Sequence, residues 1–339
     1  MERSRKIAVL GAGAWGTALA NLAARGGGEA TAEADAEVTL WARDADHVAE
    51  MAATGVNARK LPGVPLLSNV RATADLVETC VADVIFAAVP AQALRSTLQL
   101  LAPTLPGGPP IVVCAKGIEH GTGLFLCDVV AEVLPDNTPA ILSGPSFAQD
   151  VARGLPTAVT LAAHDADLAA ALGAMLAGPA FRVYSSSDVR GVEIGGAAKN
   201  VLAIANGIAA GRDLGASAGA ALLARGFAEL NRFGRAFGAQ PATLMGLSGL
   251  GDLVLTCTSM MSRNFSLGFA LGRGQTIAEA TQRIGLAEGV YTCGVLVDLA
   301  NAEGVDMPIA SAVDAVLAER ITIDEAIAAL LARPSKPEC

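Results

Sequence analysis

A lysine beside two glycines could do acid–base chemistry in this chain. Lys199 follows Gly195 and Gly196 by four and three residues, so on a helix the three residues share one face. The glycines would let a small ligand approach the ammonium, and apolar surroundings would lower the pKa of the lysine through desolvation, which suits a proton donor or acceptor near neutral pH. The same spacing fits a lysine that extends into solvent beside glycines that only permit helices to pack.

A single acidic residue follows a glycine-rich turn further along the chain. Asp252 stands at the end of the turn 246–251, directly before the apolar residues Leu253–Leu255. Its carboxylate could hold a lysine in place, or it could cap a helix that starts there. The spacing leaves both roles open.

The segment 262–264 has the residue types of a small-anion site. Ser262 or Asn264 can cap the helix predicted to follow, the first amides of that helix face outward, and Arg263 adds a positive charge. An ordinary helix start with a surface arginine has the same sequence pattern. The three histidines, at 47, 120 and 164, are not in these segments, so we do not expect a histidine-based hydride transfer.

The N-terminal segment carries a glycine pattern typical of dinucleotide binding. Gly11, Gly13 and Gly16 follow the apolar residues Ile7–Leu10 and open a helical stretch to Ala24, which is the context that a G-x-G-x-x-G motif requires. Gly11 would permit the tight turn, Gly13 would let the backbone approach the pyrophosphate, and Gly16 would let the helix pack on the strand. The alternative is a glycine-rich turn without a ligand.

The end of the second predicted strand, Val38–Trp41, bears on the choice of nucleotide. An NAD-selective site usually has Asp or Glu here to accept a hydrogen bond from the ribose 2′-hydroxyl. In this chain Arg43 follows the strand and Asp44 comes one residue later. A cation at this point tolerates or prefers the 2′-phosphate of NADP, so we expect NADP to be preferred over NAD. A solvated arginine without a ligand is the alternative, and the acidic stretch 26–37 would oppose phosphate if it folded over the site.

The first part of the chain alternates short apolar runs with helical patterns, which is typical of parallel strands joined by helical crossovers. Three further predicted strands end at residues with special chemistry: 84–89 at Pro90, 111–115 at Lys116, and 140–142 at Ser143-Gly144-Pro145. Ligands bind outside the carboxyl ends of such strands, so we expect these turns to line one crevice.

From about residue 188 strand patterns nearly vanish, and helices are predicted over 189–211, 216–237, 262–272, 277–284, 290–303 and 309–332. We therefore predict an α/β protein: a dinucleotide-binding domain with a parallel sheet at 1–188, then an all-helical substrate and catalytic domain at 189–339. The tail after Arg333 is expected to fray.

Composition limits the partners of this chain. Its 339 residues are about twice the usual size of one domain, and 52% hydrophobic against 17% charged residues excludes a disordered chain. A net charge of −9 repels polyphosphate, and 4% aromatic residues leave few platforms for stacking bases. We expect a small-molecule substrate and no nucleic acid.

No stretch approaches the roughly 18 to 20 uninterrupted apolar residues of a membrane span, and the first apolar run is too short for a signal peptide. Six cysteines occur singly and never as Cys-x-x-Cys, so neither a disulfide framework nor a zinc site is indicated. We expect a cytoplasmic protein without a membrane segment or a metal, and a homodimer is left open.

The combined motifs are more specific than the glycine pattern alone. From Ile7 to about Leu331 the chain resembles the bacterial-type NAD(P)-dependent glycerol-3-phosphate dehydrogenases. The resemblance rests on GAGAWGTALA (11–20), LPGVPL (61–66), CAKGIE (114–119), SGPSFA (143–148), GLPTAV (154–159), GGAAKNVLAIANG (195–207), GLSGLGDLVLTC (246–257), SRN (262–264) and AEGV (287–290). It implies an N-terminal Rossmann-like domain, a helical C-terminal domain and an active site between them.

The resemblance also implies roles for individual residues. Lys199 would accept the proton when the secondary alcohol is oxidised, Lys116 would touch cofactor and substrate, and Asp252 would support the lysine and the substrate hydroxyls. The substrate would meet Gly144 and Ser146, and its phosphate would meet Ser262, Arg263 and Asn264. The implied cofactor contacts, besides the three glycines, are Ala14, Trp15, Arg43, Lys116, Ala148, Arg263, Leu286 and Glu288.

The implied reaction is reversible hydride transfer between sn-glycerol 3-phosphate and the nicotinamide, which supplies the backbone of phospholipids. Two features depart from the family pattern: the long acidic stretch 26–37, and Tyr291 at a position where many members have Arg. Two rival functions share part of the pattern. One is a hydroxyacid or ketopantoate-type reductase with the same domain plan, and the other is a nucleotide-sensing protein without catalysis, which would have no need of Lys199.

Overall fold

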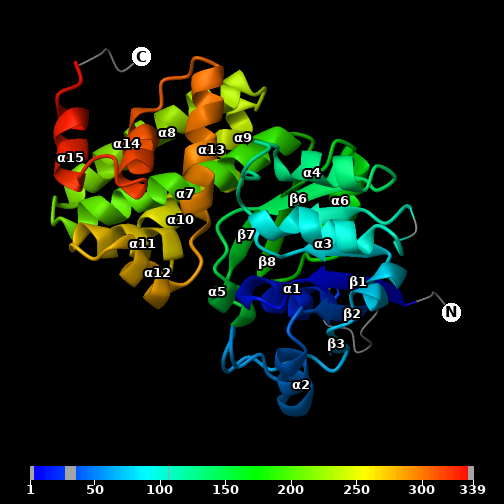
Figure 1. Ribbon diagram of the computed structural model, residues 1–339. Coiled ribbons are helices and arrows are strands. Elements are labelled where there is room, and N and C mark those ends of the chain that lie inside the picture. The colour runs from blue at the N-terminus through cyan, green and yellow to red at the C-terminus, as the bar shows by residue number, and fades with distance from the viewer. Residues whose placement is uncertain (1–3, 27–35, 106, 335–339) are drawn as a thin grey trace. The chain divides into compact units, whose positions relative to one another are not determined.

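The chain forms two compact units. The computed structural model describes residues 4–26, 36–105 and 107–334 (Figure 1). One unit comprises 1–116 and 124–193, and the other comprises 117–123 and 194–339. The predicted domains, 1–188 and 189–339, stay a prediction. Most of the acidic stretch 26–37 and the end of the tail after Arg333 lie outside the described residues.

The described part of the first unit contains an eight-stranded sheet with the order β3-β2-β1-β4-β5-β6-β7-β8. The strands are β1 (Arg5–Leu10), β2 (Ala36–Trp41), β3 (Val70–Thr73), β4 (Val84–Ala87), β5 (Ile111–Val113), β6 (Pro139–Ser143), β7 (Thr157–Ala162) and β8 (Phe181–Ser186). Strands β1 to β6 are parallel. The predicted α/β class with a Rossmann-like sheet is confirmed. The sheet is mainly rather than wholly parallel, because β7 runs antiparallel to β6 and β8 follows β7.

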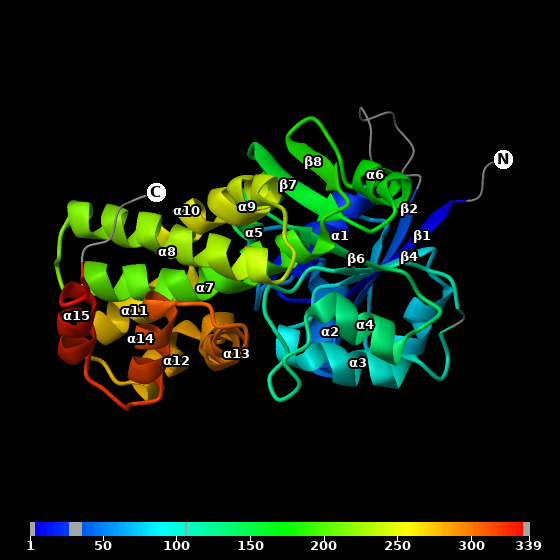
Figure 2. The same cartoon turned by 90° about the horizontal axis from the view of Figure 1, so that it is seen from above.

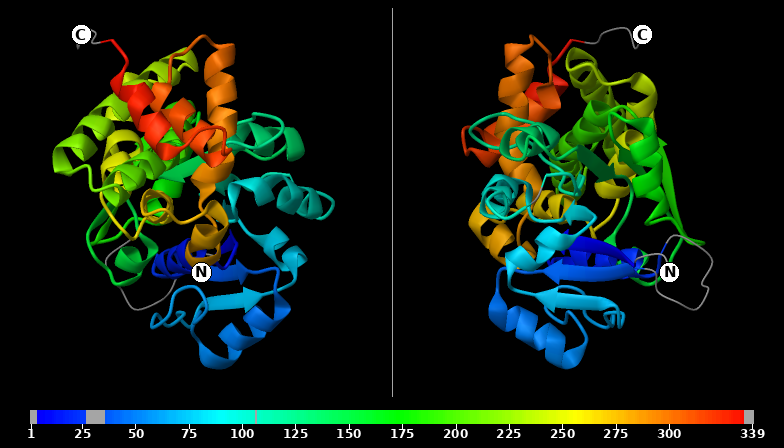
Figure 3. Two further views of the ribbon diagram at one scale, coloured as in Figure 1. Left: turned by 60° about the vertical axis from the view of Figure 1, so that its left-hand side comes forward. Right: turned by 90° about the vertical axis from the view of Figure 1, so that its right-hand side faces the viewer.

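Helices cover both faces of this sheet, so its parallel strands are buried on both sides. On β1, Ile7 and Val9 enter one core layer, while Ala8 and Leu10 enter the other. The first layer includes residues of α1 (Ala14–Ala24), α2 (Ala45–Thr54), α5 (Ala148–Ala152) and α6 (Ala166–Ala174). The second includes residues of α3 (Leu94–Leu101) and α4 (Leu126–Val133). Figure 3 shows α2 beside β3, which is the strand at one edge of the sheet.

The strands β3, β7 and β8 were not predicted, and two of them have a weak sequence signal. β3 is only four residues long, and β8 is an edge strand whose burial does not alternate cleanly. The predicted strand 84–89 ends earlier, at Ala87, and the predicted strand 111–115 ends at Val113. Lys116 therefore lies in the loop after β5.

The second unit is helical in its described residues. It contains most of α7 (Val189–Gly211), followed by α8 (Ala216–Ala236), α9 (Pro241–Met245), one turn of π-helix at Leu247–Gly251, α10 (Asp252–Cys257), α11 (Arg263–Gly272), α12 (Ile277–Ile284), α13 (Glu288–Ala302), α14 (Pro308–Leu317) and α15 (Ile323–Leu331). Figure 2 shows α7 and α8 lying alongside each other, and a Cβ on Gly226 of α8 would be 2.9 Å from a Leu202 methyl of α7.

Glycines let α7 and α11 approach closely. A Cβ on Gly207 would lie 2.1 Å from the Phe265 carbonyl oxygen, and a Cβ on Gly268 would lie 2.0 Å from the Ile204 carbonyl oxygen. The two backbones are therefore in direct contact, which fixes Lys199 of α7 relative to the start of α11.

The single helix predicted over 309–332 is wrong. The chain breaks after Leu317 and starts again at Ile323, where Thr322 and Glu325 form a capping box. This T-x-x-E signal was present in the sequence and marks a helix start. No helix in the described residues is long and apolar enough to cross a membrane.

Candidate active site

The turn from β1 into α1 has no room for side chains at two of its glycines. Gly11 has a φ of +108°, and a Cβ there would lie 2.9 Å from the Ala88 carbonyl carbon. A Cβ on Gly16 would lie 1.9 Å from the Gly11 carbonyl oxygen. Nothing lies within 4 Å of a Cβ on Gly13, so the backbone at Gly13 is open to a ligand.

The start of α1 is suited to an anion. Gly13 is its N-cap and has no side chain to accept the first amide hydrogens, and the first turn contains no acidic residue. Unsatisfied amides and the helix dipole both favour a phosphate group at this point. The close-packed glycines, the open Gly13 and the uncapped helix together fit the pyrophosphate of a dinucleotide.

Three of the predicted cofactor contacts lie in one part of the first unit. Ala14 and Trp15 open α1 and Ala148 opens α5, and all three are half-buried against the same core layer. Helices α1 and α5 pack on each other. The structure therefore brings these side chains together beside the glycine turn.

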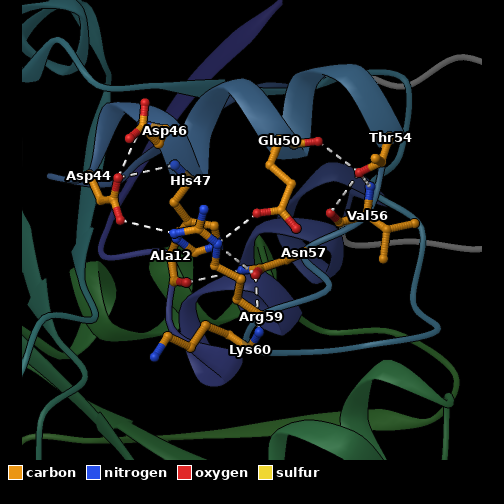
Figure 4. A network of polar contacts seen from close by, with 10 residues as sticks. All are labelled: Ala12, Asp44, Asp46, His47, Glu50, Thr54, Val56, Asn57, Arg59 and Lys60. Atoms are coloured by element: carbon orange, nitrogen blue, oxygen red, sulfur yellow. Dashed lines mark hydrogen bonds and ion pairs between the residues drawn. The ribbon is translucent and has the colours of Figure 1, made fainter.

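Arg43 and Asp44, which follow β2, differ in their hydrogen bonds and ion pairs. Arg43 is exposed, and no hydrogen bond or ion pair joins it to another described residue. Asp44 is the N-cap of α2: its Oδ1 accepts hydrogen bonds from the amides of Asp46 and His47, while Oδ2 accepts from Arg59 at 3.0 Å (Figure 4). These bonds and the Arg59 charge lower the pKa of Asp44.

Lys116 joins the strand-end residues of the first unit. Its Nζ donates to the Gly144 carbonyl oxygen at 2.9 Å, and the Ser146 hydroxyl donates to the same oxygen at 3.0 Å. Gly144 has a φ of +143°, and a Cβ there would lie 2.8 Å from the Val159 Cα, so no other residue fits the turn. Because β4, β5 and β6 are parallel neighbours, their carboxyl ends share one edge, as predicted.

Lys199 is buried in the second unit and bound to two side chains. Its Nζ donates to Asp252 Oδ1 at 2.8 Å and to the Thr256 hydroxyl at 2.8 Å. Lys199 is only 6% exposed and Asp252 only 1%. The alternative in which Lys199 extends into solvent is therefore wrong, and Asp252 holds the lysine instead of serving only as a helix cap.

The expected bare glycine surface beside Lys199 is wrong for Gly195. A Cβ on Gly195 would lie 2.5 Å from the Ser248 carbonyl oxygen, so the backbone of the turn 246–251 already covers this glycine. The glycine serves packing: it lets the turn that carries Asp252 approach α7 closely enough for the carboxylate to reach the ammonium.

Burial keeps two thiols of the described residues in their protonated form. Burial raises the pKa of Cys257, next to the Lys199–Asp252 pair, to about 12, and burial also raises the pKa of Cys114 in the first unit to about 12. Both thiols stay protonated and unreactive at neutral pH. Among the described residues, no cluster of His, Cys, Asp or Glu could hold a metal ion.

The segment 262–264 starts α11, as predicted. The Ser262 hydroxyl accepts from the Phe265 amide at 3.2 Å, and Arg263 is exposed. Asn264 is buried: its Nδ2 donates to Asn200 Oδ1 at 2.9 Å, and its Oδ1 accepts from the Gly289 amide at 2.9 Å. Asn264 therefore links the start of α11 to α7 beside Lys199 and to the start of α13, where Leu286 and Glu288 are half-buried.

Two residues of these groups were missed from sequence. Thr256 lies four residues after Asp252, on the same face of α10, which is a spacing that could have indicated it. Asn200 had no such signal, because its partner Asn264 is distant in the sequence. The groups around Lys116 and Lys199 belong to different units.

Comparison with known proteins identifies the family. The model of the NAD-dependent glycerol-3-phosphate dehydrogenase N-terminus matches residues 6–169, and the model of the C-terminus of the same family matches residues 188–328. The chain belongs to this family. The resemblance stated from the motifs is confirmed.

Two relatives and one solved structure agree with this assignment. A protein of Beijerinckia indica named glycerol-3-phosphate dehydrogenase [NAD(P)+] is 68% identical over 100% of this chain and 99% of its own length. A Bradyrhizobium protein of the same name is 61% identical and covers 98% of both chains. The crystal structure of glycerol-3-phosphate dehydrogenase from Coxiella burnetii is 41% identical, with a TM-score of 0.91 over 97% of this chain and 99% of that one.

Proposed function

We propose that this family member catalyses the reversible NAD(P)-dependent reduction of dihydroxyacetone phosphate to sn-glycerol 3-phosphate. It is an oxidoreductase acting on a CH–OH group with a small-molecule substrate. The structural observation that carries the proposal is the buried Lys199 ammonium, held by Asp252 and Thr256. The name shared by relatives that match over the whole chain supports it.

Lys199 is the proposed proton donor and acceptor. When bound, the nicotinamide supplies or accepts the hydride. In the direction of reduction, Lys199 gives a proton to the alkoxide that develops at the substrate carbonyl. The Asp252 carboxylate stabilises the charged amine that this direction requires, and Thr256 fixes the direction in which the amine points.

The substrate phosphate provides the second half of the proposed recognition. The start of α11 offers helix amides and the exposed Arg263 cation, and Ser262 and Asn264 fix the geometry of that helix start. In the first unit, Lys116, Gly144 and Ser146 are proposed to border the substrate. Anchoring one end of a three-carbon substrate positions its C2 carbon for hydride transfer.

The proposed cofactor contacts come from the glycine turn, the residues that follow several strands, and the starts of α11 and α13. They are Gly11, Gly13, Ala14, Trp15, Gly16, Arg43, Lys116, Ala148, Arg263, Leu286 and Glu288. The exposed Arg43 favours NADP over NAD. We also propose a cytoplasmic location and a role in supplying the glycerol backbone of phospholipids.

The test is a spectrophotometric assay of cofactor oxidation with dihydroxyacetone phosphate, run in parallel with NADPH and NADH. We expect turnover with both cofactors and higher kcat/KM with NADPH. Dihydroxyacetone without phosphate and ketopantoate serve as competing substrates. Equal turnover of an unphosphorylated ketone or a ketoacid would contradict the proposal and favour the hydroxyacid or ketopantoate-type reductase.

A further inference from the structure

The segment 56–60, which follows α2, is tied to the glycine turn. Asn57 is fully buried, and its Nδ2 donates to the Ala12 carbonyl oxygen at 3.0 Å and to the Thr17 hydroxyl at 2.7 Å. Thr17 in turn donates to the Gly13 carbonyl oxygen at 2.8 Å. The segment therefore holds a fixed position relative to the turn that fits the pyrophosphate.

The same segment is tied to α2. The buried His47 ring approaches Asn57 Oδ1 at 2.8 Å, and Oδ1 also accepts from the Lys60 amide at 3.2 Å. Figure 4 shows these contacts together with Arg59, which lies between Asn57 and Lys60 in the sequence. A buried amide with all these partners is costly to displace, so Arg59 starts from a rigid backbone.

Arg59 crosses from this segment to the end of β2. Its Nη1 donates to Asp44 Oδ2 at 3.0 Å, and its Nε donates to Glu50 Oε2 at 2.6 Å (Figure 4). Arg59 remains 42% exposed in its side chain, so the guanidinium is held and still reachable by a ligand.

This arrangement occupies the Asp44 carboxylate, which follows the end of β2. A carboxylate at this place in a dinucleotide-binding fold normally selects NAD by accepting from the ribose 2′-hydroxyl. In this chain Oδ1 of Asp44 caps α2 and Oδ2 pairs with Arg59, and Arg43 is the adjacent residue. Arg59 shares its charge between Asp44 and Glu50, and the exposed Arg43 adds a positive charge beside Asp44.

We propose that Arg59 is a specificity-determining residue for the cofactor: it neutralises the Asp44 carboxylate and, with Arg43, binds the 2′-phosphate of NADP(H). The inference rests on the proposed function, and it deepens the cofactor preference of that same site. Arginine suits this role because its planar guanidinium can bind a carboxylate and a phosphate oxygen through different N–H groups.

The test compares dissociation constants of NADPH and NADH for the wild type and Arg59→Met, followed by quenching of tryptophan fluorescence without substrate. Loss of a charge-assisted hydrogen bond should raise the NADPH constant about tenfold or more. The NADH constant should stay the same or fall, because Asp44 Oδ2 becomes available to the ribose 2′-hydroxyl. Arg59→Lys should restore part of the preference for NADPH.

Arg95→Met is the matched control. Arg95 of α3 forms a bidentate ion pair with Glu132 of α4, at 2.8 and 3.2 Å, in the same unit. Its removal should leave the NADPH and NADH dissociation constants unchanged. Equal weakening of NADPH and NADH by Arg59→Met, or no change in NADPH binding, would overturn the inference. Binding is measured without turnover, so this outcome is separate from a failure of the wild type to reduce dihydroxyacetone phosphate.

Discussion

At the scale of single residues, the proposed chemistry of the second unit rests on the Lys199 amine, held by Asp252 and Thr256. Lys199, Asp252 and Thr256 come from α7 and α10, and all are buried. Removing one partner of a buried ion pair leaves an uncompensated charge, so the carboxylate serves both the position and the charge of the amine. The uncharged Thr256 hydroxyl accepts a hydrogen bond from Lys199 and so helps to orient the amine.

Thr256→Val tests this directional role. The variant keeps the volume of the side chain and removes the hydroxyl that accepts from Lys199, so kcat for dihydroxyacetone phosphate should fall about tenfold, the scale of about one hydrogen bond. The KM for NADPH should not change. Thr256→Ser should retain most of the activity, and Thr258→Val, at an exposed threonine that donates to the Val254 carbonyl oxygen, is the control. Unchanged kcat in Thr256→Val would exclude the role.

The family resemblance implied that Asp252 supports Lys199, but neither it nor the spacing gave the reason for the neighbouring Gly195. Gly195 and Asp252 are distant in the sequence, and only the fold shows that the turn 246–251 packs on Gly195. Asn200 and Asn57 could not be predicted for the same reason: each is a buried amide whose partners are distant in the chain.

At the scale of elements, two glycines of the turn between β1 and α1 have different roles: Gly16 is needed for packing, and Gly13 is proposed to be needed for binding. Gly16→Ala would place a Cβ 1.9 Å from a backbone carbonyl oxygen, whereas Gly13→Ala meets nothing within 4 Å. Gly16→Ala should therefore destabilise the first unit by about 1–3 kcal/mol or more. Gly13→Ala should leave the melting temperature unchanged and raise the NADPH dissociation constant at least about tenfold by blocking the pyrophosphate. Tight NADPH binding by Gly13→Ala would contradict this assignment.

The start of α14 gives a pH-dependent prediction. Glu229 of α8 accepts hydrogen bonds from the amides of Ile309 and Ala310, and burial raises its pKa from 4.5 to about 7. Between these two values the folded protein keeps a proton that the unfolded chain has lost, so the free energy of unfolding decreases as pH rises through this window.

Glu229→Gln removes this titration and keeps a side-chain oxygen for one of the two amides. Urea unfolding of wild type and variant at pH 5 and pH 8 should show that the wild type loses more stability between the two values, at most about 1.4 kcal/mol per pH unit from this group. Glu193, whose pKa burial also raises to about 7, is present in both proteins and cancels in the comparison. Parallel pH profiles would contradict the prediction.

Element prediction gave accurate bounds for some helices and missed three of the strands. Helices α7 and α12 have the predicted bounds. β3 has four residues and β8 lies at the edge with much exposed surface, so neither has a clear pattern. The break between α14 and α15 comes just before Thr322, the N-cap of α15. The hydrophobic pattern alone does not indicate this helix start.

At the scale of the whole molecule, the two units carry complementary functions in our proposal. The first has the close-packed glycine turn and the exposed Arg43 after β2, and the second has the buried amine and the start of α11. A protein that only senses a nucleotide would need the first set and not the second. The family motifs extend over both units, which agrees with an enzyme.

Lys199→Ala, measured for turnover and for cofactor binding in the same preparation, tests the central claim most directly. Lys199→Met accompanies it, because it fills more of the space beside Asp252, and thermal unfolding establishes that each variant is folded. We predict that kcat for dihydroxyacetone phosphate reduction falls at least about a hundredfold, the usual contribution of a general acid or base, while the NADPH dissociation constant stays within about twofold of wild type. Turnover close to that of the wild type in a folded variant would contradict the account.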